Sequence, residues 1–183
     1  MLKNVALILF ILSGSVYADG SWAEADTDLK RLSPEVFKEL PSNVKRDLSK
    51  RGCLVPQCCF NKTPHNVVSG SFVRKGQTDW AVLCSSGRVS SILIYVGAST
   101  ETVMAIESYR DMTFLQHMGD GLIMYSRYIG RLPASNVRDI YKRAKSVDIP
   151  GDIHDGLVDG FAEKASSIFY YHKGKWDSLP GAD

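Results

Sequence analysis

Four carboxylate side chains lie close together near the C-terminal end of the chain, in the segment DIHDGLVDGFAEKAS. They belong to Asp152, Asp155, Asp159 and Glu163. Gly156 and Gly160 lie between them and give the backbone the freedom to fold around a single point. Because calcium binds about 6 to 8 oxygen atoms, including those of carboxylates, this pattern predicts a calcium site in a loop.

The same segment also fits an ordinary turn, because Asp-Gly pairs are common in turns whatever the function. Its spacing differs from that of an EF-hand, whose acids occupy alternate positions ahead of a glycine. In this alternative Asp155 and Asp159 accept hydrogen bonds from backbone N–H groups, and Glu163 pairs with Lys164 or a neighbouring arginine. Like charges this close repel without a cation or donors, so the sequence favours the turn over the metal site.

No residue is assigned a catalytic role, because the chain has no Gly-x-Ser-x-Gly, His-Glu-x-x-His or Cys-x-x-Cys motif. The histidines are scattered singly along the chain, at His65, His117, His154 and His172. His65 follows a proline in a predicted loop, where hydrogen bonding to the backbone is the expected role. The sequence therefore indicates a non-catalytic protein rather than an enzyme.

The first 18 residues have the pattern of a secretory signal peptide. Lys3 precedes an apolar run from Val5 to Leu12, and small residues end the segment at Ala18. The run is far shorter than the roughly 20 apolar residues that a membrane-spanning helix needs. We therefore expect cleavage after Ala18 and a periplasmic or secreted protein without a membrane span.

Four cysteines in an exported chain predict at least one disulfide. Cys53 follows a predicted helix and Cys84 ends a predicted strand, so a bond between them would attach the N-terminal helices to the sheet. We expect this pairing. Cys58 and Cys59 are adjacent, and a bond between neighbours is strained. The sequence leaves open whether these two stay reduced, pair with each other or compete for Cys84.

Apolar periodicity and turn residues predict the elements of the remaining chain. Helices are expected at 32–40, 40–52, 99–110 and 133–145, and strands at 66–73, 79–85, 89–97 and 122–130. A final hairpin is expected at 165–179, with its turn around Gly174. The segment 89–97 is almost continuously apolar, which is typical of a strand buried on both faces.

These elements predict a single α+β domain over 33–183, in which helices pack on one face of a largely antiparallel sheet. A signal peptide at 1–18 and a flexible lead-in at 19–32 precede it. The formal net charge is +2, and no long run of basic residues interleaves with aromatic ones. Nucleic acid is therefore not an expected partner.

Several segments resemble a family of small secreted bacterial proteins of unknown function. They are RGCLVPQ, PHNVVSGSF, GQTDWAVLCS, SSILIYVG, HDGLVDGFAEKASSIFYYHKGKW and LPGAD. The resemblance covers most of the chain after Leu40 and implies no activity, substrate or catalytic residue. Cys58 and Cys59 depart from the family's pattern. A fainter resemblance links GSFVRKGQTDWAVL to FG-GAP-like propeller blades, but their calcium-binding Asp-x-Asp-x-Asp-Gly core is missing.

Aromatic residues on the predicted strands suggest how such a protein would act. Trp80 and Phe169 are expected in the core, and the place of Tyr171 is left open. An exposed aromatic face of the sheet would bind an envelope protein or a glycan. The sequence therefore favours an exported, non-catalytic binding or structural module of the bacterial envelope. The alternative is a calcium-binding or hydrolytic envelope enzyme.

Overall fold

The computed structural model describes residues 17–58, 61–119, 121–143 and 151–181. Its main feature is a pair of four-stranded antiparallel sheets, in each of which consecutive strands of the chain pair with one another. Sheet I contains β3 (Val67–Gly70), β4 (Asp79–Ser86), β5 (Val89–Tyr95) and β6 (Val103–Arg110). Sheet II contains β9 (Arg127–Leu132), β10 (Gly156–Phe161), β11 (Ala165–His172) and β12 (Lys175–Pro180).

Shorter elements surround the two sheets. The α-helices are α1 (Tyr17–Asp28), α2 (Ser42–Lys50) and α3 (Ala134–Arg143). Two further antiparallel pairs join β1 (Arg31–Leu32) to β2 (Val55–Pro56) and β7 (Leu115–His117) to β8 (Ile123–Tyr125). Single 3-10 turns are η1 (Pro34–Val36), η2 (Val96–Ala98) and η3 (Asp111–Phe114). Among the described residues, no helix is long and apolar enough to cross a membrane.

The two sheets pack against each other through one apolar core. Leu83 of β4 and Ile92 of β5 share this core with Leu157 of β10 and Phe169 of β11. Each of these side chains is 6% exposed or less. The core therefore lies between the sheets and holds them as adjacent layers.

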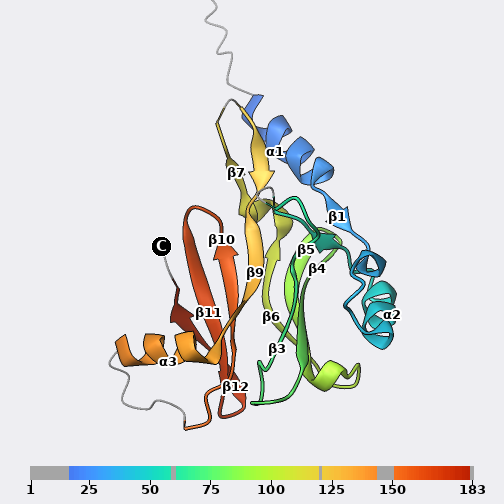
Figure 1. Ribbon diagram of the computed structural model, residues 1–183. Helices are drawn as coiled ribbons and strands as arrows, with labels where there is room; N and C mark the ends of the chain where they lie inside the picture. The colour runs from blue at the N-terminus through green and yellow to red at the C-terminus, as the bar shows by residue number, and fades with distance from the viewer. Residues whose placement is uncertain (1–16, 59–60, 120, 144–150, 182–183) are drawn as a thin grey trace, which may run out of the picture.

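A helix covers the outer face of each sheet. Val44 and Leu48 of α2 pack with Val82 on sheet I, while Val137 and Tyr141 of α3 pack with Tyr170 on sheet II. Figure 1 shows α2 and α3 on opposite sides of the molecule, with the two sheets between them. The expectation of one sheet with helices on one face is therefore not confirmed, although the largely antiparallel architecture is.

This layering explains the apolar run in β5. Ile92 and Ile94 face the core between the sheets, whereas Leu93 and Tyr95 face α2. Successive side chains of a strand point to opposite faces, so a strand covered on both faces is apolar at every position. The prediction that this strand is buried on both faces is confirmed.

The predicted helix at 99–110 is wrong, because residues 103–110 form the edge strand β6. A bulge between β5 and β6 pairs Ile92 with Ile106 and Ser90 with Tyr109. The bulged stretch of β6 contains Glu107, whose φ is 53°. One inserted residue puts Ile106 and Tyr109 three positions apart on a strand, and this spacing imitates the period of a helix.

The predicted helix at 32–40 is also wrong, since only the short turn η1 forms there. Ser33 caps this turn as expected, and its Oγ accepts a hydrogen bond from Glu35 N at 3.3 Å. Pro41 follows closely, and a proline disfavours helical backbone at the preceding residue. The second N-terminal helix is confirmed as α2, and Gly52, with a φ of 67°, lies just beyond its end.

The lead-in at 19–32, expected to be flexible, contains most of α1. Asp26 on this helix is 6% exposed. Its carboxylate pairs with Arg31 at 2.8 Å and with Arg88 at 3.2 Å. Trp22 and Leu29 pack against the core between the sheets. These tertiary contacts stabilise a segment whose own composition predicts no structure. Residues 1–16, which include most of the expected signal peptide, lie outside the described residues.

The predicted strand at 122–130 is divided into β8 and β9 at Ser126. The helix expected at 133–145 is confirmed as α3 over its described part. The final hairpin is confirmed as β11 and β12, and its turn residues Lys173 and Gly174 have φ values of 49° and 83°. Positive φ at both central positions is the geometry of the tight turns that suit twisted hairpins.

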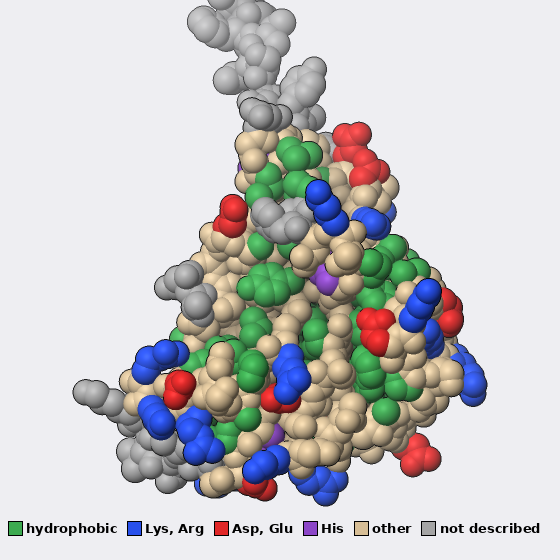
Figure 2. Space-filling view, in the orientation of Figure 1, with side chains coloured by type: hydrophobic (Ala, Val, Ile, Leu, Met, Phe, Trp, Pro, Cys, Tyr) green, Lys and Arg blue, Asp and Glu red, His purple; other side chains and the backbone are tan. Residues whose placement is uncertain are grey.

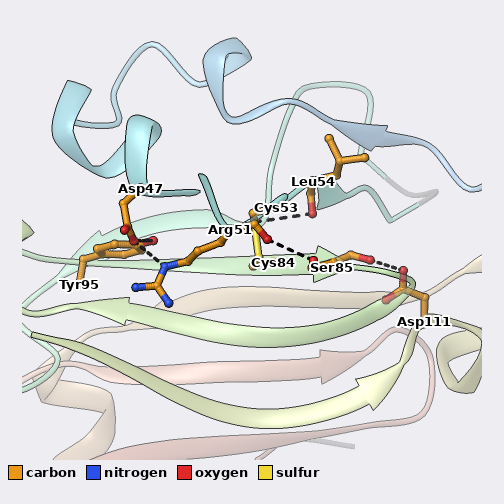
Figure 3. Close-up of a disulfide and its surroundings, with 9 residues drawn as sticks. Asp47, Arg51, Cys53, Leu54, Cys84, Ser85, Tyr95 and Asp111 are labelled. Atoms are coloured by element: carbon orange, nitrogen blue, oxygen red, sulfur yellow. Dashed lines mark hydrogen bonds and ion pairs between the residues drawn. A yellow bond between two sulfur atoms is a disulfide. The ribbon is translucent and has the colours of Figure 1, made fainter. Parts of the chain in front are cut away.

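The expected disulfide between Cys53 and Cys84 is present and connects the end of α2 to β4 (Figure 3). Beside it, the backbones of Leu54 and Ser85 exchange hydrogen bonds of 2.9 and 2.8 Å. Cys58 is buried and not bonded to another described cysteine, and Cys59 lies outside the described residues. The disulfide therefore attaches the helical layer to sheet I at one point.

Replacing both Cys53 and Cys84 with serine is expected to lower the free energy of unfolding by about 3 to 4 kcal/mol, because the bond closes a long loop in the unfolded chain. Urea denaturation of the purified oxidised protein measures this change. A reducing agent should destabilise the wild type by a similar amount and leave the double variant unaffected. Equal effects of reductant on both proteins would contradict the assignment.

Candidate functional site

The structure does not gather the four carboxylates of the predicted calcium site. Asp152 and Glu163 are exposed, whereas Asp155 is buried. The segment expected to be a loop is largely the strand β10, and Asp159 lies within it. Among the described residues, no group of three or more His, Cys, Asp or Glu side chains could hold a metal ion. The predicted loop is therefore wrong, because the segment pairs with β9 and β11.

Asp155 connects three parts of the chain. Its carboxylate accepts hydrogen bonds from Ser71 N at 2.9 Å and from Ala134 N at 3.2 Å. It also pairs with Arg131 at 2.9 Å. Ala134 is the first residue of α3, where unpaired N–H groups favour a carboxylate. Asp155 therefore accepts backbone N–H bonds, as the turn alternative expected, and fixes the start of α3 against sheet II.

Asp159, expected in the turn alternative to accept backbone N–H bonds, instead forms an ion pair with the buried Arg127 on the neighbouring strand β9. The two carboxylate oxygens accept hydrogen bonds from Nε and Nη2 of Arg127, each at 2.9 Å. Nη1 donates to the backbone oxygen and the hydroxyl of Ser90, at 3.3 and 3.2 Å, and Nη2 also donates to Glu107 O at 3.1 Å. A guanidinium has five N–H donors, and these five bonds use all of them.

Arg127 is 0% exposed, so its charge depends entirely on these partners. Its guanidinium carbon also lies 4.5 Å from the centre of the Phe114 ring and 5.7 Å from that of Tyr109. Ser90 and Glu107 belong to sheet I, whereas Arg127 and Asp159 belong to sheet II. The cluster therefore joins the two sheets by directional bonds as well as by apolar packing.

The next residue along β9 points to the opposite, outer face of sheet II. Tyr128 pairs with Gly160 across the two strands. A Cβ atom at position 160 would overlap the Tyr128 ring, so the ring lies directly over the glycine. The ring is partly exposed and has no aromatic or cation–π partner within the described part of the chain. Gly160 thus allows Tyr128 to lie against the sheet as a flat platform.

A cavity of about 710 Å³ extends from this platform to α3, and we call it the α3 groove. Its lining residues come from both sides of the groove and are Tyr128, Leu132, Asn136, Asp139, Ile140, Arg143, Val158, Ser166, Ile168, Pro180 and Gly181. Small-molecule sites in proteins typically have volumes of about 300 to 1,000 Å³. The α3 groove falls within this range.

One face of α3 forms a wall of the groove. Asn136, Asp139, Ile140 and Arg143 line it, and their spacing of three and four residues places them on one side of a helix. The opposite side of α3 carries the buried Val137 and points into the protein. In the space-filling view, charged side chains gather over α3 at the lower left, with hydrophobic side chains beside them (Figure 2).

The charged side chains at this wall are in contact with water. Asp139 lies 3.8 Å from Lys142 in an ion pair whose side chains are 62% and 60% exposed. Such an exposed pair contributes little to stability. Arg143 is exposed as well, so both Asp139 and Arg143 are available to form hydrogen bonds with a ligand.

The histidines take part in structural contacts. His65 Nε2 accepts a hydrogen bond from Cys58 N at 2.7 Å, and its Nδ1 lies 3.0 Å from Thr63 O. His154 stacks on Tyr170 with ring centres 4.4 Å apart, and His117 meets the edge of Trp22 at 4.9 Å. The expected backbone role of His65 is confirmed.

The geometry of His65 fixes a neutral imidazole. Because Nε2 accepts the Cys58 N–H, the ring proton is on Nδ1 and is donated to Thr63 O. Burial lowers the pKa of His65 below its usual 6.5, against a raising effect of the Thr63 hydrogen bond. Nearby Lys30 lowers this pKa further.

The predicted aromatic residues divide between the core and the surface. Phe169 is in the core as expected, and Trp80 is partly buried against the cluster under α2. Tyr171, whose place the sequence left open, packs against Trp176 with ring centres 5.3 Å apart. Tyr109, which the sequence placed on a helix, is 44% exposed on β6.

Sequence reasoning missed the roles of Arg127 and of the α3 side chains that line the groove. The signal for Arg127 is a single arginine in an otherwise apolar and aromatic segment, LIMYSRYIG. The signal for the groove wall is the polar spacing of Asn136, Asp139 and Arg143 on the predicted helix. Comparison of the chain with protein-family models, with curated proteins and with solved structures found no match.

Replacing Arg127 with methionine is expected to lower the free energy of unfolding by about 3 to 5 kcal/mol, because the Asp159 carboxylate, only 10% exposed, would lose its partner. Urea denaturation measures the change. Lys175→Met is the control, since it removes an exposed ion pair with Asp177 and should cost less than about 1 kcal/mol. Similar costs for the two variants would contradict a central role of Arg127.

Stability is expected to fall as the pH is lowered from 7.5 to 5.5, in part through His65. Its pKa is lower in the folded protein than in the unfolded chain, so the unfolded chain binds more protons below about pH 6.5. The stabilisation is complete above this pH and is lost as the pH falls through the folded pKa. Urea midpoints across this range should depend less on pH in His65→Gln than in the wild type or in His172→Gln. An unchanged pH dependence in His65→Gln would refute the assignment.

Proposed function

We propose that this protein is an exported, non-catalytic binding module that holds its ligand in the α3 groove. The proposal rests on an aromatic ring, a polar helix face and a cavity that lie together in this groove. A flat, partly exposed Tyr128 ring lies opposite the polar face of a helix, across a cavity of about 710 Å³. An aromatic and apolar floor with a few polar side chains is the usual composition of a ligand site.

The rigidity of the groove supports binding. Tyr128 lies on β9, which pairs with β10, and the Arg127–Asp159 ion pair joins the same two strands. The first residue of α3 is fixed by its hydrogen bond to Asp155. A site on rigid elements loses little conformational entropy when a ligand binds. The groove is therefore suited to recognise a ligand without reorganisation.

The composition of the groove favours binding over catalysis. Among the described residues, those that line the groove include neither histidine nor cysteine. Activation of a serine nucleophile needs a base within hydrogen-bonding distance, and histidine is the usual one. The alternative of a calcium-binding or hydrolytic enzyme has no comparable supporting observation among the described residues.

Export is supported by two independent features. The signal-like N-terminus predicts secretion, and the disulfide between Cys53 and Cys84 is typical of an oxidising compartment. The natural ligand of the groove would then be a component of the cell envelope or of the surroundings.

Immobilised protein is expected to retain a component of a cell-envelope extract through the α3 groove. Tyr128→Ala removes the platform, and Val158→Trp fills the floor, so both variants should lose at least about 90% of the retained material, which corresponds to a tenfold weaker affinity. Fractionation and mass spectrometry of the eluate measure retention. Circular dichroism checks that the variants are folded.

The matched control is Tyr171→Ala, which removes another partly buried tyrosine of sheet II that does not line the groove. It should retain the same component as the wild type. Equal retention by the wild type and both groove variants would refute the proposal, as would retention of nothing by the wild type.

A further inference from the structure

We infer that the ligand of the α3 groove is a saccharide, an inference that rests on the proposed function. Tyr128 offers a flat aromatic surface on which a sugar ring can pack. Tyr128 lies with one face over Gly160 and is partly exposed. The apolar C–H face of a sugar ring packs well on a flat aromatic ring, while the hydroxyl groups at the ring's edge remain free for hydrogen bonds.

The surface next to the platform provides space for a ring. Gly130 is on the same strand as Tyr128, and it pairs with Val158. A Cβ atom at position 130 would meet only Val158, at 3.8 Å. Two glycines therefore flank Tyr128 on this face, one beneath its ring and one beside it. A broad, flat ligand can approach the sheet here, whereas larger side chains would obstruct it.

The opposite wall of the groove has the hydrogen-bond donors and acceptors that sugar hydroxyls need. Asn136 offers both donors and acceptors, Asp139 offers acceptors, and Arg143 offers donors. A sugar hydroxyl both donates and accepts, so neighbouring hydroxyls match this mixture. Residues 136 and 143 are separated by about 10 Å along the helix axis, which extends this polar wall over more than one sugar ring.

The charges of the groove lining favour a neutral ligand. Asp139 and Arg143 carry opposite charges, so together they leave the groove lining without net charge. A neutral polar ligand is therefore favoured over an anion or a cation. A fatty acyl chain is disfavoured, because its binding would remove water from these charged groups and offer no hydrogen bonds in exchange.

Isotope-labelled protein is titrated with three neutral tetrasaccharides, made of β-1,4-linked N-acetylglucosamine, β-1,4-linked glucose or α-1,4-linked glucose. At least one should shift the amide resonances of groove residues and bind saturably by calorimetry. Tyr128→Ala should weaken this binding at least about tenfold, and Asp139→Asn or Arg143→Gln about threefold or more. Tyr128→Phe, which keeps the ring, and Tyr171→Ala should bind within about threefold of the wild type.

Decanoate and tetra-alanine serve as probes of other ligand classes. If none of the tetrasaccharides binds, or if binding is unaffected by Tyr128→Ala, the saccharide inference is overturned. Tyr128-dependent binding of decanoate or tetra-alanine alone overturns it as well but leaves the proposed function standing. Retention of the same envelope component by the wild type and Tyr128→Ala overturns the proposed function itself. Because Asp139 is exposed on α3, Asp139→Asn tests the groove without altering the sheet, and unchanged saccharide binding by this variant also overturns the inference.

Discussion

The structure depends on one buried cation, the guanidinium of Arg127, which lies where the two sheets meet. A charge without access to water is tolerated only when it is paired and fully hydrogen-bonded. Asp159 neutralises it from the adjacent strand, and Ser90 and Glu107 accept its remaining N–H groups from sheet I. These bonds have fixed directions, so they define the position of one sheet relative to the other. Apolar contacts are not directional and restrict this position less.

The inward position of Arg127 also determines which side chains lie on the outer face of sheet II. Successive residues of a strand point to opposite faces, so an inward Arg127 requires an outward Tyr128. The same pairing that sets Asp159 inward sets Gly160 under the Tyr128 ring. The buried cluster and the exposed platform are therefore two faces of one strand register, and a shift of one residue would destroy both.

The helices complete the architecture by covering the outer faces that the sheet-to-sheet core leaves exposed. On sheet I, α2 covers its face closely and is attached by the Cys53–Cys84 bond. On sheet II, α3 buries Val137 against the strands, while its Asn136, Asp139 and Arg143 line open space. The groove exists because α3 covers only part of its sheet.

The elements with local signals could be predicted from the sequence. Continuous apolar runs marked β4 and β5, the spacing of Val44 and Leu48 marked α2, and Lys173-Gly174 marked the last turn. The cysteine pairing also followed from positions at element ends. Long-range contacts, in contrast, make 103–110 a strand, make 19–28 helical and place Asp159 beside an arginine instead of a metal. The reason is physical: these outcomes depend on partners distant in the chain, such as Arg88 for Asp26, which no local pattern contains.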